Sequence, residues 1–212
     1  MGHIPRTEVL RNGVFDRRAL AAIVRAVAIV AQERRRDTFV HVQPHAHATA
    51  RIARYIGHHV IGRRRSNQQA LDAIEFGAHL HDIGKYFVDP CLLLKPGALS
   101  DEELGVMSLH PVYGALITSK LLGDSGPVRL AVLHHHEHWD GSGYPDGLVG
   151  TAIPLVARIV CLADVYTALR ARRSYKPTLN KREALKAVTL MAGRELDPYL
   201  VEDFVSLVGG PH

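Results

Sequence analysis

The chain has 212 residues, 47% hydrophobic and 22% charged, with a formal net charge of +5 and an isoelectric point near 9.4. These values fit one fairly large soluble domain that buries its own core. The longest apolar run, 26–31, is far shorter than the roughly 20 residues of a membrane span, and the N-terminus lacks a secretory pattern. We therefore expect a cytoplasmic protein, whose positive charge favours anionic partners such as nucleotides, nucleic acid or acidic membranes.

The first forty residues predict a helical extension. Asp16 can cap a helix whose apolar positions recur at helical spacing, namely Leu20, Ile23, Val24, Val27 and Val30. The arginine-rich run 33–37 is interpreted as the solvated end of that helix. We divide the chain into an extension, 1–40, and a main domain, 41–212. The only cysteines, Cys91 and Cys161, are too few for a disulfide framework and are expected to be buried thiols.

Three histidines surround the predicted start of the next helix. Pro44 favours the first helical position, where its missing N–H costs least. His41 and His45, four residues apart, share a face if the helix begins earlier, whereas His47 points elsewhere. Taken alone, each histidine is more simply a surface or core residue than a metal ligand.

A histidine, a carboxylate and an ammonium group cluster where the following helix meets a glycine. Asn67 can cap this helix, and its buried face is predicted to hold Leu71, Ile74, Ala78 and His81. Asp82 and Lys85 follow at once. A carboxylate buried beside a histidine is costly unless it is paired or metal-bound, so Asp82 needs a partner.

Two further helices bring histidines to the predicted core. Ser100 and Glu103 form a capping-box pattern, and the helix they start reaches His110, with Pro111 marking a bend or a new first turn. A helix from Pro127 has an apolar face that continues into a histidine pair, through Val128, Ala131, Val132, His135 and His136.

The run 134–138 holds four histidines and an acid, and a glycine-rich turn follows it. Imidazole suits transition metals, but adjacent helical residues point about 100° apart. The helix must therefore end here, and other segments must supply ligands. His134 and His138 are predicted to be bystanders, and Glu137 is predicted to support a ligand rather than bind metal.

The last third of the chain predicts three more helices. Pro154 opens one that contains Asp164, a capping-box pattern of Asn180 with Glu183 opens the next, and the last begins at 197–198. No sustained strand alternation is present. The sequence therefore predicts an all-α single domain of about seven helices around one core.

Several motifs occur in the order of a known signature: His81-Asp82 with Gly84-Lys85, His110-Pro111, His135-His136-Glu137, Asp140-Gly141-Ser142-Gly143-Tyr144-Pro145, Asp164 and Tyr175-Lys176. From about residue 44 to 208 the chain resembles an HD-GYP domain. This bacterial family is a branch of the HD superfamily of metal-dependent phosphohydrolases. The resemblance implies a helical bundle of the HD-domain type.

The resemblance also implies a metal centre whose ligands are His45, His81, Asp82, His110, His135, His136 and Asp164. Asp82 would bridge two metals. His45 is the best match to the first family histidine. Some members bind a third metal through a carboxylate four residues earlier, where this chain has His41. The histidine and carboxylate set fits divalent iron or manganese better than structural zinc.

The implied activity is hydrolysis of a cyclic dinucleotide, foremost cyclic di-GMP to linear pGpG and on to GMP, by a hydroxide that bridges the metals. Asp82 and Lys85 would be catalytic, and Lys85 matches the family lysine beside the metals. Arg173 and Lys176 match phosphate-binding positions, and Tyr144 is assigned to substrate binding.

Alternative functions are hydrolysis of another nucleotide and a catalytically weak docking module in cyclic-dinucleotide signalling. The complete Gly-Tyr-Pro motif argues against the first, and Asp82 together with Lys85 argues against the second. The Gly-Tyr-Pro loop could contact a signalling partner, and a homodimer is left open. Nucleic-acid binding is disfavoured because the arginine runs are scattered over helix ends rather than gathered on one face.

Overall fold

The computed structural model describes residues 10–11, 14–15, 36–62, 67–122, 126–171 and 178–209, with side chains from residue 44 onward. In chain order the elements are β1 (Leu10–Arg11), β2 (Val14–Phe15), α2 (Arg36–Ile61), α3 (Gln68–Leu80), η2 (Ile83–Phe87), α4 (Pro90–Leu93), α5 (Asp101–Met107), α6 (His110–Leu122), α7 (Gly126–His134), η3 (Gly150–Ala152), α8 (Leu155–Arg170), α9 (Lys181–Met191) and α10 (Pro198–Gly209). The predicted all-α fold is confirmed. The described ranges hold nine α-helices, α2 to α10, against about seven expected.

The N-terminal part contains one feature that the sequence patterns did not predict. β1 and β2 form a two-residue antiparallel ladder that pairs Leu10 with Phe15 and Arg11 with Val14. The helix expected from Asp16 lies outside the described residues. Helix α2 already begins at Arg36, and the division of the chain at residues 40 and 41 stays a prediction.

Helix α2 is longer than the sequence pattern suggested. Pro44 lies inside it rather than at its first position, so the predicted helix start was wrong. A proline inside a helix removes one backbone hydrogen bond. Packing of α2 against α3 and α8 can offset this cost.

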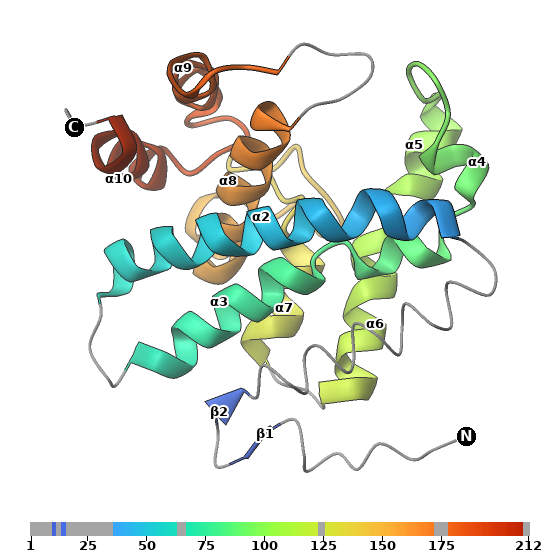
Figure 1. Cartoon of the computed structure of the whole chain (residues 1–212), viewed down its shortest axis with the longest axis horizontal. Helices are drawn as coiled ribbons and strands as arrows, with labels where there is room; N and C mark the ends of the chain where they lie inside the picture. The colour runs from blue at the N-terminus through green and yellow to red at the C-terminus, as the bar shows by residue number, and fades with distance from the viewer. Residues whose placement is uncertain are drawn as a thin grey trace.

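Helices that cross one another build the core (Figure 1). Helix α2 crosses the molecule and packs on α3 and α8, while α7 packs on α3, α6 and α8. Helices α9 and α10 lie at one end of the molecule, and α4, α5 and α6 lie at the other. The main core cluster joins α2, α3, α7, α8, α9 and α10, and a second cluster joins α3, η2, α6 and α7. The ends of α3 and α7 therefore meet in the middle of the fold.

Several predicted helix ends are confirmed. Both capping boxes are present, from Ser100 to Glu103 and from Asn180 to Glu183. Asp197 accepts hydrogen bonds from the first backbone N–H groups of α10. Asn67 precedes α3, but its side chain does not cap that helix and instead donates to the carbonyl of Ile61.

Other local predictions were wrong. His110 is the first residue of α6, not part of the helix that Ser100 caps, because α5 ends at Met107. Cys91 is exposed, whereas Cys161 is buried as expected. In the described part of the chain, no helix combines the length and hydrophobicity needed to cross a bilayer.

Candidate metal centre

The structure brings together seven sequence-predicted side chains from distant parts of the chain. They come from α2, the turn after α3, the start of α6, the turn after α7, and α8. The members are His45, His81, Asp82, His110, His135, His136 and Asp164. Every helix that supplies one packs on at least two others, so core packing fixes the arrangement.

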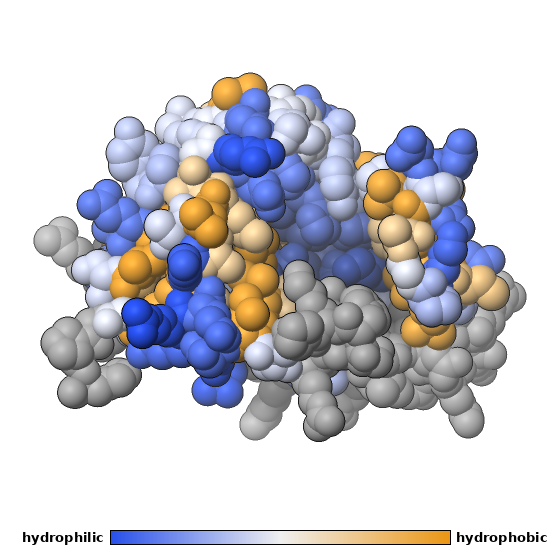
Figure 2. Space-filling view, turned by 90° about the horizontal axis from the view of Figure 1, so that it is seen from above, coloured by the Kyte–Doolittle hydropathy of each residue, from blue (hydrophilic) through white to orange (hydrophobic). Residues whose placement is uncertain are grey.

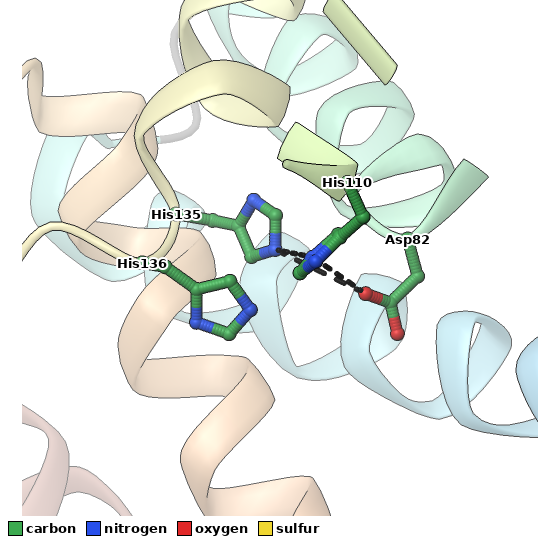
Figure 3. A group of neighbouring side chains, drawn as sticks. All are labelled: Asp82, His110, His135 and His136. Atoms are coloured by element: carbon green, nitrogen blue, oxygen red, sulfur yellow. Dashed lines mark hydrogen bonds and ion pairs between the residues drawn. The ribbon is translucent and has the colours of Figure 1, made fainter. Parts of the chain in front are cut away.

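Four of these side chains form the first group (Figure 3). Asp82, His110, His135 and His136 each offer a ligand atom within 4.8 Å of the others. The Nε2 atom of His110 lies 3.4 Å from Nε2 of His135 and 3.4 Å from Oδ1 of Asp82. Nitrogen and oxygen atoms at these separations can surround one divalent cation.

The second group joins α2, α3 and α8. Nε2 of His45 lies 2.5 Å from Oδ1 of Asp164, and Nε2 of His81 lies 3.5 Å from the same oxygen. Of the three candidates for the first histidine, His45 is the one in this group. The ring of His47 instead stacks edge-on with that of His79, and the side chain of His41 lies outside the described residues.

Asp82 lies between the two groups. Its Oδ1 faces His110, at 3.4 Å, and its Oδ2 faces Nε2 of His81, also at 3.4 Å. Nζ of Lys85 donates to Oδ2 over 2.7 Å. Each carboxylate oxygen thus faces a different set of histidines, which is the placement that a metal-bridging carboxylate requires.

Three histidines are oriented by the backbone of the preceding turn. Nδ1 of His81 donates to the carbonyl of Ala78, and His110 and His135 make the equivalent bonds to carbonyls three residues back, at 2.7–2.8 Å. This bond fixes the ring and leaves Nε2 directed at the centre. Metal-binding histidines are commonly held in this way.

Two buried polar atoms in the centre have no hydrogen-bond partner within the described part of the chain. They are Nε2 of His81 and Oδ1 of Asp82, in side chains that are 0% and 5% exposed. A buried polar atom without a partner costs about 1–3 kcal/mol, and more when the group is charged. A divalent cation would satisfy both atoms, so the donor set and its burial fit a metal.

Burial and charge set the protonation of the centre. Burial, together with the nearby histidines, holds the pKa of His135 well below its usual range and lowers that of His136 to about 3. Burial also lowers the pKa of His81, but the carboxylates of Asp82 and Asp164 outweigh it and raise the value to about 10. Burial raises the pKa of Asp82, yet the charges of His81 and Lys85 keep it well below its usual range.

A close backbone approach explains the glycine that follows Asp82. A Cβ atom on Gly84 would lie 1.9 Å from the carbonyl oxygen of His110 and 2.7 Å from the backbone nitrogen of Gly114. Only glycine allows η2 to lie this close to the start of α6. This contact brings Asp82 and Lys85 next to His110.

The Gly-Tyr-Pro loop folds back over the end of α7. A Cβ atom on Gly143 would lie 2.2 Å from the backbone nitrogen of His138, and the N–H of Tyr144 donates to the carbonyl of His136. The Tyr144 ring stacks on His136 with centroids 4.9 Å apart. The loop therefore forms part of the wall of the centre, and burial raises the pKa of Tyr144.

Two predicted phosphate-binding residues, Arg173 and Lys176, lie outside the described residues. Lys85, the other cationic residue predicted to bind substrate, lies near the centre beside Asp82. His138 contacts Ser142 and belongs to none of the metal-type groups among the described residues. The ligand and substrate roles assigned to all these residues stay predictions.

Sequence patterns did not predict the burial of His134, which is interpreted as a bystander of the centre and lies in neither of its two groups. Its side chain is 7% exposed and faces Glu137 and Asp146. The oxygens of Glu137 accept the N–H groups of Asp146 and Leu148, and its predicted role in supporting a ligand stays a prediction. A sequence signal was available, because His134 lies three residues after the buried Ala131 and so continues the same helix face.

The family model of the HD domain matches residues 33–200. A protein of Vibrio cholerae named cyclic di-GMP phosphodiesterase is 35% identical over 94% of this chain and 42% of its own length. A second protein of the same organism, named 3'3'-cGAMP-specific phosphodiesterase 2, is 36% identical over 85% of this chain and 33% of its own. This chain thus spans less than half the length of these curated relatives.

A solved structure of an HDG"Y"P protein from Bdellovibrio bacteriovorus superposes with a TM-score of 0.64. The superposition covers 91% of this chain and 61% of the Bdellovibrio chain, and the two sequences are 20% identical. At that identity the likeness concerns the fold. It supports the same arrangement of helices around the centre.

Proposed function

Because this chain belongs to the HD-GYP branch of the HD domain family, we propose that it is a metal-dependent phosphodiesterase that hydrolyses cyclic di-GMP. The observation that carries the proposal is the position of Asp82 between two groups of histidines. Such a carboxylate can hold two divalent cations at the separation used in two-metal hydrolysis, about 3.5–4 Å.

We assign the metal positions from the two groups. His110, His135 and His136 would hold one cation, His45, His81 and Asp164 would hold the other, and Asp82 would contact both. The mixed nitrogen and oxygen donors fit iron or manganese. Bound there, the metals would supply Lewis acidity toward the phosphate and lower the pKa of a water molecule.

The protein groups have separate tasks in this proposal. Asp82 stays ionised, because the charges of His81 and Lys85 hold its pKa down. The Lys85 side chain is 25% exposed, and its ammonium group lies beside Oδ2 of Asp82, where it can stabilise negative charge that develops on the phosphate. The Tyr144 ring, stacked on His136, would form an apolar wall for a nucleobase.

A groove of about 610 Å³ between α2, α8, α9 and α10 supports an extended anionic substrate. Its lining includes Ile52, which lies seven positions after His45 and hence on the same side of α2. Three cationic side chains also line it: Arg51, Arg170 and Lys181. Figure 2 shows a hydrophilic hollow near the middle of one face of the molecule.

We propose that this groove binds the part of the dinucleotide that is not cleaved. Replacing Arg51 by Gln should raise KM about tenfold with little change in kcat, since a hydrogen bond to a charged group is worth about 1.5–3 kcal/mol. Arg182, exposed on α9 and outside the groove lining, offers the matched control Arg182→Gln. Equal KM values for the two variants would reject the groove as a substrate-binding site.

The experiment that tests the function combines metal analysis with product analysis. The purified protein should contain about two transition-metal ions per chain and convert cyclic di-GMP into the linear dinucleotide. The same assay with 3'3'-cGAMP decides between the two substrates named among the relatives. Metal-replete protein that cleaves neither substrate would reject the proposal and favour a docking module.

A further inference from the structure

A third group of metal-type side chains lies in the single segment 134–146, which also contains the histidine pair. His134 ends α7, Glu137 lies in the turn that follows, and Asp146 lies in the Gly-Tyr-Pro loop. Each offers a ligand atom within 4.8 Å of the others. Because adjacent residues at a helix end project about 100° apart, His134 faces this group while His135 faces Asp82.

The imidazole of His134 has an unmet bonding requirement. Its Nδ1 atom is buried and has no hydrogen-bond partner within the described part of the chain. Nδ1 lies 3.7 Å from Oε1 of Glu137 and 3.6 Å from Oδ2 of Asp146, too far for a hydrogen bond to either. Ligand atoms about 2.0–2.1 Å from a tetrahedral zinc ion lie about 3.3–3.4 Å apart. The observed separations are close to that geometry.

Glu137 is positioned before any metal binds. Its side chain is 0% exposed. Its Oε1 accepts the N–H of Asp146 over 2.8 Å, and its Oε2 accepts the N–H of Leu148 over 2.9 Å. A carboxylate oxygen that accepts one hydrogen bond keeps a second lone pair. Oε1 can therefore bind a cation while the loop stays in place.

Asp146 provides the open side of the group. Its side chain is 55% exposed, so a cation can enter from solvent and keep a water molecule as its fourth ligand. One histidine and two carboxylates with one open position match the ligand number of zinc sites with three protein ligands, and this low ligand count, rather than the donor type, favours zinc here over the iron or manganese proposed for the centre. The two carboxylates also supply negative charge to attract the cation.

We propose that His134, Glu137 and Asp146 form a zinc site, separate from the catalytic centre, that clamps the Gly-Tyr-Pro loop to the end of α7. The loop carries Tyr144, whose ring stacks on His136. Zinc at this site links Asp146 to α7 and so holds Tyr144 against the centre. Zinc binding at this site does not depend on the proposed hydrolysis. The functional value of holding Tyr144 against the centre rests on the proposed function.

The test counts zinc bound by the purified holoprotein. In equilibrium dialysis against zinc, the wild type should bind one equivalent more than Asp146→Asn. The zinc affinity of this site should fall more than about 100-fold in Asp146→Asn. A residue that only supports a ligand would cause a smaller loss, about 10–100-fold. Asp146 is exposed, so this variant keeps its fold. His138→Gln is the control, because His138 lies in the same segment outside the group. It should retain the additional equivalent.

A second variant separates this site from the catalytic centre. Asp82→Asn disables the proposed hydrolysis and should still bind the additional zinc, with a zinc-dependent rise in the unfolding temperature that the double variant Asp82→Asn, Asp146→Asn lacks. The proposal is overturned if wild type and Asp146→Asn bind equal amounts of zinc, or if His138→Gln rather than Asp146→Asn loses the additional equivalent. An additional equivalent that disappears with Asp82→Asn alone would also overturn it.

Discussion

Two clusters of histidine and acidic side chains meet at the end of α7, and they differ in how they are built. The centre around Asp82 draws on α2, α3, α6, α7 and α8, and its histidine rings are held by backbone carbonyls. The cluster of His134, Glu137 and Asp146 comes from one short segment, and one member is 55% exposed.

The comparison shows that one histidine run supplies two environments. His134 and His135 are adjacent, yet they face different carboxylates because the helix turns between them. The first environment depends on tertiary packing, and the second on the local course of a loop. Substitutions in the two clusters should therefore have effects of different size and kind.

The largest effect is expected from Asp82→Asn. The amide keeps the shape of the side chain but lacks the charge that would bridge two metals, so the protein should lose bound metal from both positions. Hydrolysis of cyclic di-GMP should fall more than about 10³-fold, beyond the loss of a single charge-stabilising donor. Metal content is measured on purified protein alongside the rate. The control is Asp203→Asn, exposed on α10, which should change neither metal content nor rate. An Asp82→Asn variant that still binds metal and hydrolyses substrate would show that Asp82 does not bridge the metals.

A smaller effect is expected from Lys85→Met. This change removes the ammonium group 2.7 Å from Asp82 and keeps much of the aliphatic chain. Metal content should stay near that of the wild type while kcat falls about 10²-fold, as for loss of one charge-stabilising donor. Lys120→Met, on the exposed face of α6, is the control. An unchanged kcat would assign Lys85 to structure alone.

Metal affinity should depend on pH through His81. Its pKa in the metal-free protein is raised to about 10, so at neutral pH the ring carries a proton that a metal must displace. His135 and His136, whose pKa values are lowered, are already neutral. Affinity for Mn²⁺ should therefore fall about tenfold for each pH unit below the raised pKa, with about one proton released on binding.

Calorimetry in buffers of different ionisation enthalpy measures that release, and titrations at pH 6 and pH 8 measure the affinity. The sign follows from the ligand requirement: only neutral His81 binds metal, so acid weakens binding. Binding that is equally tight at both values, without proton release, would show that His81 is not protonated in the metal-free centre.

The smallest effect is expected from Glu137→Gln. The carboxylate accepts two backbone N–H groups of the loop, whereas an amide offers one oxygen and turns a donor toward the other N–H. The free energy of unfolding should fall by about 1–3 kcal/mol, the cost of a buried group left without its partner. Urea denaturation without added zinc measures it against Glu202→Gln, exposed on α10. A loss no larger than the control's would show that the loop does not depend on Glu137.

Local patterns predicted much of the fold. Helical spacing placed Leu71, Ile74, Ala78 and His81 on one face, and all four are buried. Capping residues such as Ser100 and Asn180 act within four residues, so their pattern can be read directly from sequence. Pro44 misled the prediction because packing of α2 outweighs its local cost.

The ordered motifs also predicted which residues gather in the centre, although not how they pair. The contact between His45 and Asp164 joins residues far apart in the chain, and no spacing rule connects them. The position of Asp82, with each carboxylate oxygen near a different histidine, likewise follows from the close approach of α6 to η2 at Gly84. The burial of His134 was not predicted because the helix face was extended only to His135 and His136, although His134 lies three residues after the buried Ala131.

By itself the sequence determined the helical class and most helix ends, because these depend on short-range spacing. The set of side chains expected to bind metal came from the resemblance of the ordered motifs to the HD-GYP family. The tertiary structure decided which nitrogen faces which carboxylate. Those pairings depend on how five helix segments cross, and crossing is set by packing over the whole core. For the run 134–138, composition marked a metal-type segment, and only the fold divided its histidines between the catalytic centre and the loop.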